Sequence, residues 1–175
     1  MYILQGWHQM YQWFTILNLM LDQPDNSVSA EGLRAALVVS HYHNDITTQL
    51  ETESLLYFIH SGGLERDCRS FYTAGSWELP VIAKQIIETK KVDLIVVLGC
   101  IITGETNHDK VIGYSIAQGL MDLSISWGNP VAMGVLTCQT MTQALERTNS
   151  THSNKGQEAM HAAIQAAQTI RSIQS

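Results

Sequence analysis

The chain alternates between short apolar runs and longer segments with helical periodicity. The first run, RAALVVS, ends in polar residues as buried strands do, and the segment after it spaces its apolar residues like a helix. This alternation continues almost to the end of the sequence. It predicts strands at 34–40, 68–75, 92–100 and 130–137, and helices at 45–60, 80–89, 141–147, from 108 and from 154.

Four successive strand–helix units favour one fold class. Such alternation is typical of a parallel sheet covered by helices on both faces. The run VDLIVVLGC at 92–100 is continuous and rich in branched residues, which indicates a strand buried on both sides. The sequence therefore predicts a three-layer α/β sandwich with a four-stranded parallel sheet. Its 175 residues suit one domain.

Residues 1–33 differ from this pattern. They are rich in aromatics and Met and contain no Lys or Arg, which argues against a secretory signal or transit peptide. Polar residues interrupt the apolar run, so no membrane span is expected, and residues 22–31 have the composition of a linker. We interpret 1–33 as an appendage and linker that rests on a neighbouring subunit, and 34–175 as the domain.

Composition narrows the class of partner. Charged residues make up 15% of the chain, against about 25% in typical domains, which suggests that other subunits cover part of the surface. The net charge of −6 argues against nucleic-acid binding, although a single Arg at a helix start suffices for a small phosphate. Cys68, Cys100 and Cys138 form no Cys-x-x-Cys pair, so a reducing, cytoplasmic setting without structural zinc is expected.

Candidate chemistry lies in the loops that follow the strands, because ligands bind beyond the carboxyl ends of parallel strands. In GETNH, Gly104 permits close backbone approach, and the amides of Glu105 and Thr106 precede a helix, which suits a phosphate. An ordinary N-cap loop fits the same spacing. His108 in the first helical turn suits a proton carrier, or is a partly exposed surface histidine.

Other loop residues allow two interpretations each. Tyr42 suits stacking on a flat ring, or lies over the sheet edge. Glu78, beside Ser76 and Trp77, suits binding of sugar-like hydroxyls, or complements the dipole of its own helix. Arg147 suits a phosphate clamp, or is solvated. No Ser/His/Asp or Cys/His triad, Walker motif or dinucleotide fingerprint is recognisable.

Three segments together resemble the lumazine synthase family of riboflavin biosynthesis. They are AGSWELP, LGCIITGETNH and PVAMGVLTCQTMTQALERTNSTHSNKGQEAM, in the family's order, within a match from Arg34 nearly to the C-terminus. The resemblance implies a flavodoxin-like fold and condensation of 5-amino-6-(D-ribitylamino)uracil with 3,4-dihydroxy-2-butanone 4-phosphate. The products are 6,7-dimethyl-8-ribityllumazine, phosphate and water. It implies neither a metal nor an organic cofactor.

The resemblance also implies roles for individual residues. His108 would transfer protons, Arg147 would reach the phosphate from an adjacent subunit, and Glu158 would support the site. The phosphate loop would comprise Gly104, Glu105 and Thr106. The residues matched to the ribitylaminouracil site are Tyr42, Ser76, Trp77, Glu78, Cys100, Ile101, Ile102, Met133 and Lys155.

Some positions depart from the family pattern. Ala74 replaces a usual proline, Tyr42 and Met133 stand where phenylalanine is frequent, and HDKV lacks the aromatic that usually follows the histidine. None of these changes removes a catalytic group.

Assembly is implied by the same resemblance. Family members form pentamers with sites at subunit interfaces, and many close into icosahedral shells. TNSTHS lacks the insertion associated with free pentamers, which favours a shell of twelve pentamers. Riboflavin synthase is a candidate partner.

Two rival functions remain open at this stage. An archaeal-type riboflavin synthase shares the fold but uses no phosphorylated substrate, so the GETNH loop disfavours it. A lumazine- or flavin-binding shell protein would keep the fold without turnover. A lumazine synthase and a riboflavin synthase differ in substrate. In a binding protein, His108 and Arg147 would contribute to ligand affinity but not to a reaction rate.

Overall fold

The computed structural model describes residues 28–149 and 154–175. Within them, β1 (Ala35–Ser40), β2 (Cys68–Thr73), β3 (Leu94–Ile102) and β4 (Val131–Cys138) form one sheet in the order β2-β1-β3-β4. Every adjacent pair is parallel. All four predicted strands are confirmed, and their carboxyl ends meet at one edge of the sheet.

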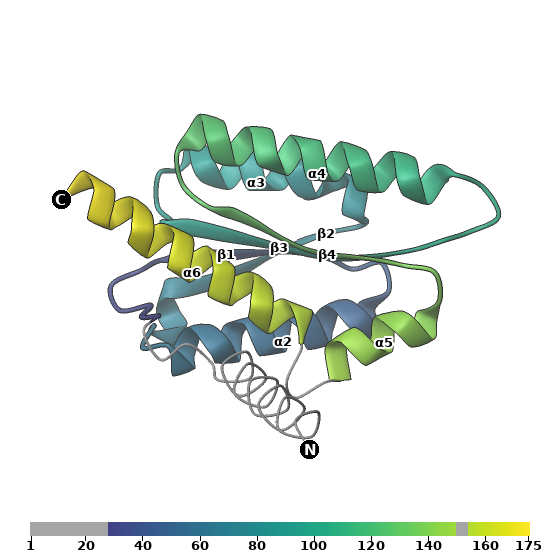
Figure 1. Cartoon of the computed structure of the whole chain (residues 1–175), viewed down its shortest axis with the longest axis horizontal. Coiled ribbons are helices and arrows are strands. Elements are labelled where there is room, and N and C mark those ends of the chain that lie inside the picture. Colours follow the sequence, from purple (N-terminus) through teal and green to yellow (C-terminus); the bar gives the residue numbers. More distant parts are fainter. Residues whose placement is uncertain (1–27, 150–153) are drawn as a thin grey trace, which may run out of the picture.

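Helices cover both faces of the sheet (Figure 1). On one face lie α3 (Leu79–Glu88) and α4 (His108–Trp127). On the other lie α2 (Asn44–His60), α5 (Met141–Asn149) and α6 (Lys155–Gln174). Short 3-10 turns, η1 (Glu65–Asp67) and η2 (Ser76–Glu78), flank β2. The predicted three-layer flavodoxin-like α/β sandwich is confirmed.

The sheet splits the core into two layers, and β3, one of its two inner strands, is buried from Leu94 to Ile101. Its side chains alternate between the two faces, as strand geometry requires. Leu94, Val96, Leu98 and Cys100 pack on the side of α2 and α6, and Ile95, Val97 and Ile101 pack on the side of α3 and α4. Burial on both faces explains why this strand is a continuous apolar run.

The observed β3 is shifted two residues from the predicted 92–100. At its start, the Asp93 N–H donates to the Arg34 carbonyl at 2.7 Å, and the Asp93 carboxylate accepts from the Arg34 N–H at 2.8 Å. At its end, the Thr103 N–H donates to the Cys138 carbonyl at 2.9 Å. Pairing with β1 and β4 therefore sets the ends of this strand.

The predicted appendage 1–33 lies outside the described residues up to position 27. Within 28–33, Val28, Ala30 and Leu33 are buried in the core. The Ala30 N–H donates to the Ser61 carbonyl at 2.7 Å, and the Arg171 guanidinium donates to the Gly32 carbonyl at 3.1 Å. This short segment packs against the ends of α2 and α6. Across the described part of the chain, no helix is long and apolar enough to cross a membrane.

The last helix begins at a side-chain cap. Asn154 Oδ1 accepts hydrogen bonds from the N–H groups of Gly156 at 2.8 Å and Gln157 at 3.3 Å, as predicted for an N-cap asparagine. Its Nδ2 donates to the Thr148 carbonyl near the end of α5. One buried asparagine thus fixes the start of α6 relative to α5.

Candidate active site

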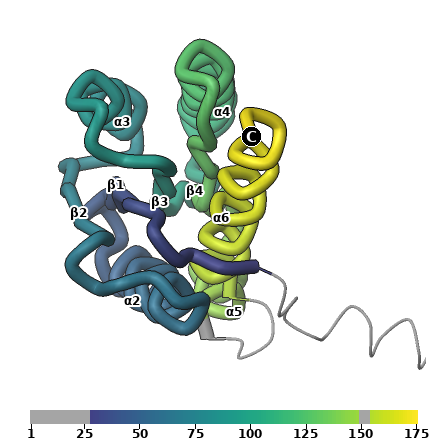
Figure 2. Tube along the Cα trace, turned by 90° about the vertical axis from the view of Figure 1, so that its left-hand side faces the viewer, coloured from purple at the N-terminus to yellow at the C-terminus, as the bar shows by residue number. Residues whose placement is uncertain are grey.

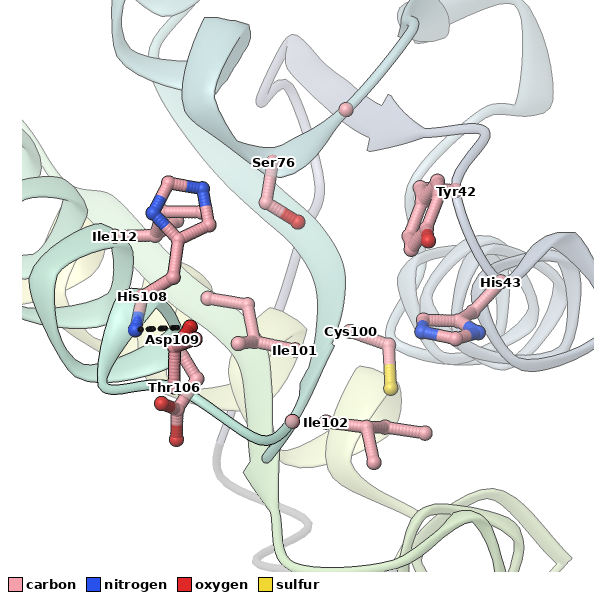
Figure 3. Close-up of a pocket in the computed structure, with 12 residues that line it drawn as sticks. Tyr42, His43, Ser76, Cys100, Ile101, Ile102, Thr106, His108, Asp109 and Ile112 are labelled. Atoms are coloured by element: carbon pink, nitrogen blue, oxygen red, sulfur yellow. Dashed lines mark hydrogen bonds between the residues drawn. The ribbon is translucent and has the colours of Figure 1, made fainter.

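A cleft of about 530 Å³ opens beyond the carboxyl ends of β1, β2 and β3 (Figure 3). This is where ligands bind in parallel α/β sheets. It is lined by the last residues of β3, by the loops that follow three strands and by the first turns of α4. The lining residues are Tyr42, His43, Gly75, Ser76, Cys100, Ile101, Ile102, Gly104, Thr106, His108, Asp109 and Ile112.

The loop between β3 and α4 forms the polar end of the cleft. Thr106 Oγ1 accepts from the His108 N–H at 3.4 Å, and the Thr103 hydroxyl donates to Asp109 Oδ2 at 2.9 Å. These contacts hold the loop at the start of a 20-residue helix. No atom lies within 4 Å of where a Cβ on Gly104 would be, so a ligand can approach the backbone closely. The positive end of the helix dipole at this point suits a phosphate.

The opposite side of the cleft carries an exposed aromatic ring. Figure 3 shows Tyr42 and His108 on opposite sides, with Cys100 and Ile101 between them. The Tyr42 side chain is 65% exposed, and its ring meets the His43 ring edge-on at 4.7 Å between centroids. His43 has left-handed backbone angles at the start of α2, which turn the chain sharply out of β1. The Tyr42 ring is therefore free to stack on a flat ligand.

The turn after β2 forms one wall. Glu78 Oε2 accepts from the Gly75 N–H at 3.0 Å, and the Thr73 hydroxyl donates to the Gly75 carbonyl at 2.7 Å. This network places the buried Ser76 against the cleft. Trp77 and Glu78 are exposed and lie outside the lining, so within one chain Glu78 acts as a brace for the turn.

The thiol in the cleft lies in surroundings that disfavour its thiolate form. Burial, with a smaller effect of the neighbouring Cys138, raises the pKa of Cys100 to about 12. Burial also raises the pKa of Cys138. At neutral pH Cys100 is protonated, and it serves as an apolar wall between Tyr42 and Ile101.

Several predicted site residues do not reach this cleft. Arg147 is exposed on α5 and donates to the Gln143 carbonyl at 2.8 Å, while Lys155 pairs with Glu158 at 2.6 Å in the first turn of α6. Met133 is 42% exposed on β4, and Glu105 is exposed in the phosphate loop without lining the cleft. One chain thus supplies only part of the predicted site.

Four lining residues were not predicted: His43, Gly75, Asp109 and Ile112. Asp109 Oδ1 is buried without a hydrogen-bond partner among the described residues. His43 directly follows the predicted Tyr42, and Asp109 directly follows the predicted His108. Their position next to predicted site residues is the sequence feature that could have identified them. Within residues 28–149 and 154–175, no cluster of three or more His, Cys, Asp or Glu side chains is arranged to hold a metal.

The parallel sheet, the cleft at its carboxyl edge and the phosphate-type loop define a flavodoxin-like α/β protein with a small-molecule site. The family model of 6,7-dimethyl-8-ribityllumazine synthase matches residues 32–171. This chain belongs to the 6,7-dimethyl-8-ribityllumazine synthase family, which confirms the resemblance seen in the sequence.

Similar proteins carry the same name. The 6,7-dimethyl-8-ribityllumazine synthase of Aquifex aeolicus is 33% identical over 149 residues, covering 85% of this chain and 97% of the relative. That of Deinococcus radiodurans is 36% identical, covering 83% and 94%. That of Corynebacterium kroppenstedtii is 38% identical, covering 83% and 89%. The similarity thus spans nearly the whole of each relative.

Proposed function

We propose that this chain is a 6,7-dimethyl-8-ribityllumazine synthase. It condenses 5-amino-6-(D-ribitylamino)uracil with 3,4-dihydroxy-2-butanone 4-phosphate and releases phosphate and water. The observation that carries the proposal is the cleft, which gathers Tyr42, Ser76, Ile101, Thr106 and His108 from separate loops in a member of this family. A phosphate-type loop in that cleft favours this reaction over lumazine dismutation, whose substrate has no phosphate.

Each side of the cleft suits one substrate. The exposed Tyr42 ring stacks on the uracil, and backbone groups of Ile101 and Ile102 form hydrogen bonds with its polar edge. Ser76 lies on the wall that holds the ribityl chain. The butanone phosphate binds at Gly104 and Thr106, where the start of α4 is electropositive. Holding both substrates in one cleft removes much of the entropic cost of their reaction.

The condensation needs proton transfers and stabilisation of the leaving group, but no redox step. The 5-amino group attacks the butanone carbonyl, and loss of one water gives an imine. Elimination then breaks the C–O bond to phosphate and leaves an enol, which tautomerises to a ketone at the adjacent carbon. The ring closes when the ribitylamino nitrogen attacks this new carbonyl and another water is lost. His108 moves protons in these steps, and the loop amides with Arg147 stabilise the departing phosphate.

Arg147 acts on the cleft of a neighbouring copy in this proposal. Its exposed side chain does not line the cleft of its own chain. An apolar stripe on α4 supports assembly, because Val111, Tyr114, Met121 and Ile125 are all more than half exposed at heptad-like spacing. We assign the protein to homopentamers that close into an icosahedral shell in the cytoplasm, where riboflavin synthase consumes the lumazine.

Assembly through this stripe predicts a shift in sedimentation. Wild-type protein is expected to sediment as pentamers or shells, far above the 19.5 kDa chain. Ile125→Glu places a charge on the stripe and is expected to yield smaller species, because burying an unpaired carboxylate is costly. Ile173→Glu makes the same change at a 78%-exposed residue near the end of α6 and is the matched control. Wild-type protein that sediments as a monomer contradicts the assembly.

The activity is tested by mixing the protein with both substrates and following lumazine fluorescence together with phosphate release. The expected result is equal formation of lumazine and phosphate, faster than in the same mixture without protein. Incubation with lumazine alone is expected to give no riboflavin. An unaccelerated reaction refutes the proposed enzyme, and tight lumazine binding without turnover would instead identify a binding protein.

A further inference from the structure

A second cavity lies at the opposite edge of the sheet from the active-site cleft. It occupies about 560 Å³ at the amino ends of β1, β2 and β3, beneath the end of α3. Figure 2 shows β2 at the outer edge of the sheet, on the side of α3. All strands of a parallel sheet run the same way, so their amino ends and their carboxyl ends lie at opposite edges. The length of the strands therefore separates this cavity from the cleft. Its lining residues are Arg34, Ala35, Arg66, Asp67, Arg69, Phe71, Gln85, Ile86, Thr89, Lys91 and Val92.

The cavity concentrates positive charge in an acidic protein. Of the ten Lys and Arg residues in a chain of net charge −6, Arg34, Arg66, Arg69 and Lys91 line this one space. Asp67 is the single carboxylate in the lining. Like charges drawn together in this way raise the local potential and attract an anion.

Three of these cations take part in no ion pair with a carboxylate of the described residues. Arg34 is held by Asp93, with its Nε 3.2 Å from Asp93 Oδ2. Among the described residues, no ion pair joins Arg66, Arg69 or Lys91 to a carboxylate. A ligand anion could therefore pair with these cations without displacing a carboxylate of the described residues. Guanidinium groups are well suited to bidentate binding of phosphate.

The floor of the cavity is apolar and partly aromatic. Ala35, Ile86 and Val92 form it together with Phe71, which is half-buried. The Arg69 guanidinium lies 5.8 Å from the centre of the Phe71 ring. Arg69 and Phe71 are two residues apart on β2, so their side chains lie on the same face of the strand. A flat ring can stack on this Arg–Phe pair, while a hydrated inorganic anion would leave the floor unused.

We propose that this cavity is a binding site for an aromatic phosphate of the size of a nucleoside monophosphate, separate from the active-site cleft. Arg66 and Lys91 hold the phosphate, and Arg69 with Phe71 holds the ring. The volume matches the range of small-molecule sites. The site depends on neither the phosphate loop of α4 nor His108, so it stands or falls independently of the proposed synthase activity.

The test uses isothermal titration calorimetry of the assembled protein with adenosine 5′-monophosphate, adenosine and inorganic phosphate in separate arms. The monophosphate is expected to bind about tenfold or more tightly than either fragment, since it uses both the cations and the floor. Arg66→Gln and Arg69→Gln are each expected to raise its Kd by about tenfold, because each removes a charge-assisted contact. Phe71→Leu is expected to weaken the binding of the monophosphate but not the binding of inorganic phosphate.

The control variants separate this cavity from the cleft. Lys84→Gln removes a cation from α3 that is already paired with Glu88 at 2.6 Å, and it is expected to bind the monophosphate like wild type. Lumazine formation by Arg66→Gln and Arg69→Gln is expected to stay at the wild-type rate, which also shows that they fold. Wild-type affinity in both Arg variants, or inorganic phosphate that binds as tightly as the monophosphate, overturns the proposal.

Discussion

Arg147→Ala is expected to slow lumazine and phosphate formation together by about a hundredfold or more, as loss of a preorganised charge-stabilising group does. Arg147 is exposed on α5 and away from the cleft of its own chain. In the proposed assembly its guanidinium stabilises the phosphate that leaves the neighbour's cleft. The rate is measured by lumazine fluorescence at saturating substrate, and the sedimentation profile of the variant checks that it still assembles.

Mixed assemblies test whether Arg147 acts across subunits. His108→Ala is expected to be similarly slow, because it removes the proton carrier. When the two variants are dissociated, mixed in equal amounts and reassembled, some clefts combine an intact His108 with an intact Arg147 from the neighbour. With random mixing in a ring of head-to-tail contacts, about half of the clefts have an intact His108, and about half of those have a neighbour with an intact Arg147. About a quarter of the wild-type rate is therefore restored. If both residues acted within one chain, no mixed cleft would be complete.

The control for this experiment is another exposed arginine. Arg171 lies on α6 and contacts Asp93 at 3.8 Å, far along the chain from the phosphate loop. Arg171→Ala is expected to keep the wild-type rate. A mixture of His108→Ala and Arg147→Ala that stays as slow as either variant alone contradicts the placement of Arg147 on the neighbouring cleft.

Much of the fold follows from local pattern. The buried run at 92–100 predicts a central strand because a strand covered on both faces has no polar side to display. Asn154 predicts the start of α6 because its side chain caps the first turn. The exact limits of β3 could not be predicted, since they depend on Arg34, which lies 59 residues from Asp93. The strand order likewise depends on how the helical crossovers pack.

The lining of the cleft was predictable to the extent that it lies in loops. Gly104, Thr106 and His108 fall at the carboxyl edge of the sheet because they directly follow a strand, and topology alone places them there. The left-handed turn at His43 and the buried oxygen of Asp109 have no local sequence signal. They arise from how the loops pack. Arg147, Met133 and Lys155 were matched by family resemblance alone, and none of them lines the cleft of its own chain.

Gly156→Ala is expected to destabilise the fold strongly. At the start of α6, a Cβ on this residue would overlap the Leu50 carbonyl oxygen and lie 2.8 Å from the carbonyl carbon, so it would collide with the backbone of α2. The Ser54 hydroxyl donates to the Gly156 carbonyl at 2.8 Å, which ties the two helices together at this crossing. Backbone in the middle of a helix cannot move aside, so α6 would have to shift. A loss of about 3 kcal/mol or more is expected.

The large destabilisation expected for Gly156→Ala comes from the close crossing of α2 and α6, and not from replacing a glycine as such. Gly119→Ala, in the middle of α4, makes the same change where the nearest atom is the Pro80 Cβ at 3.6 Å, an ordinary contact. There the added methyl lowers the entropy of the unfolded chain and is expected to stabilise the protein by about 0.5–1 kcal/mol. Thermal unfolding of both variants at equal protein concentration gives the comparison. Equal melting temperatures would show that α2 and α6 tolerate a wider separation, and that the close approach at Gly156 is not required for the fold.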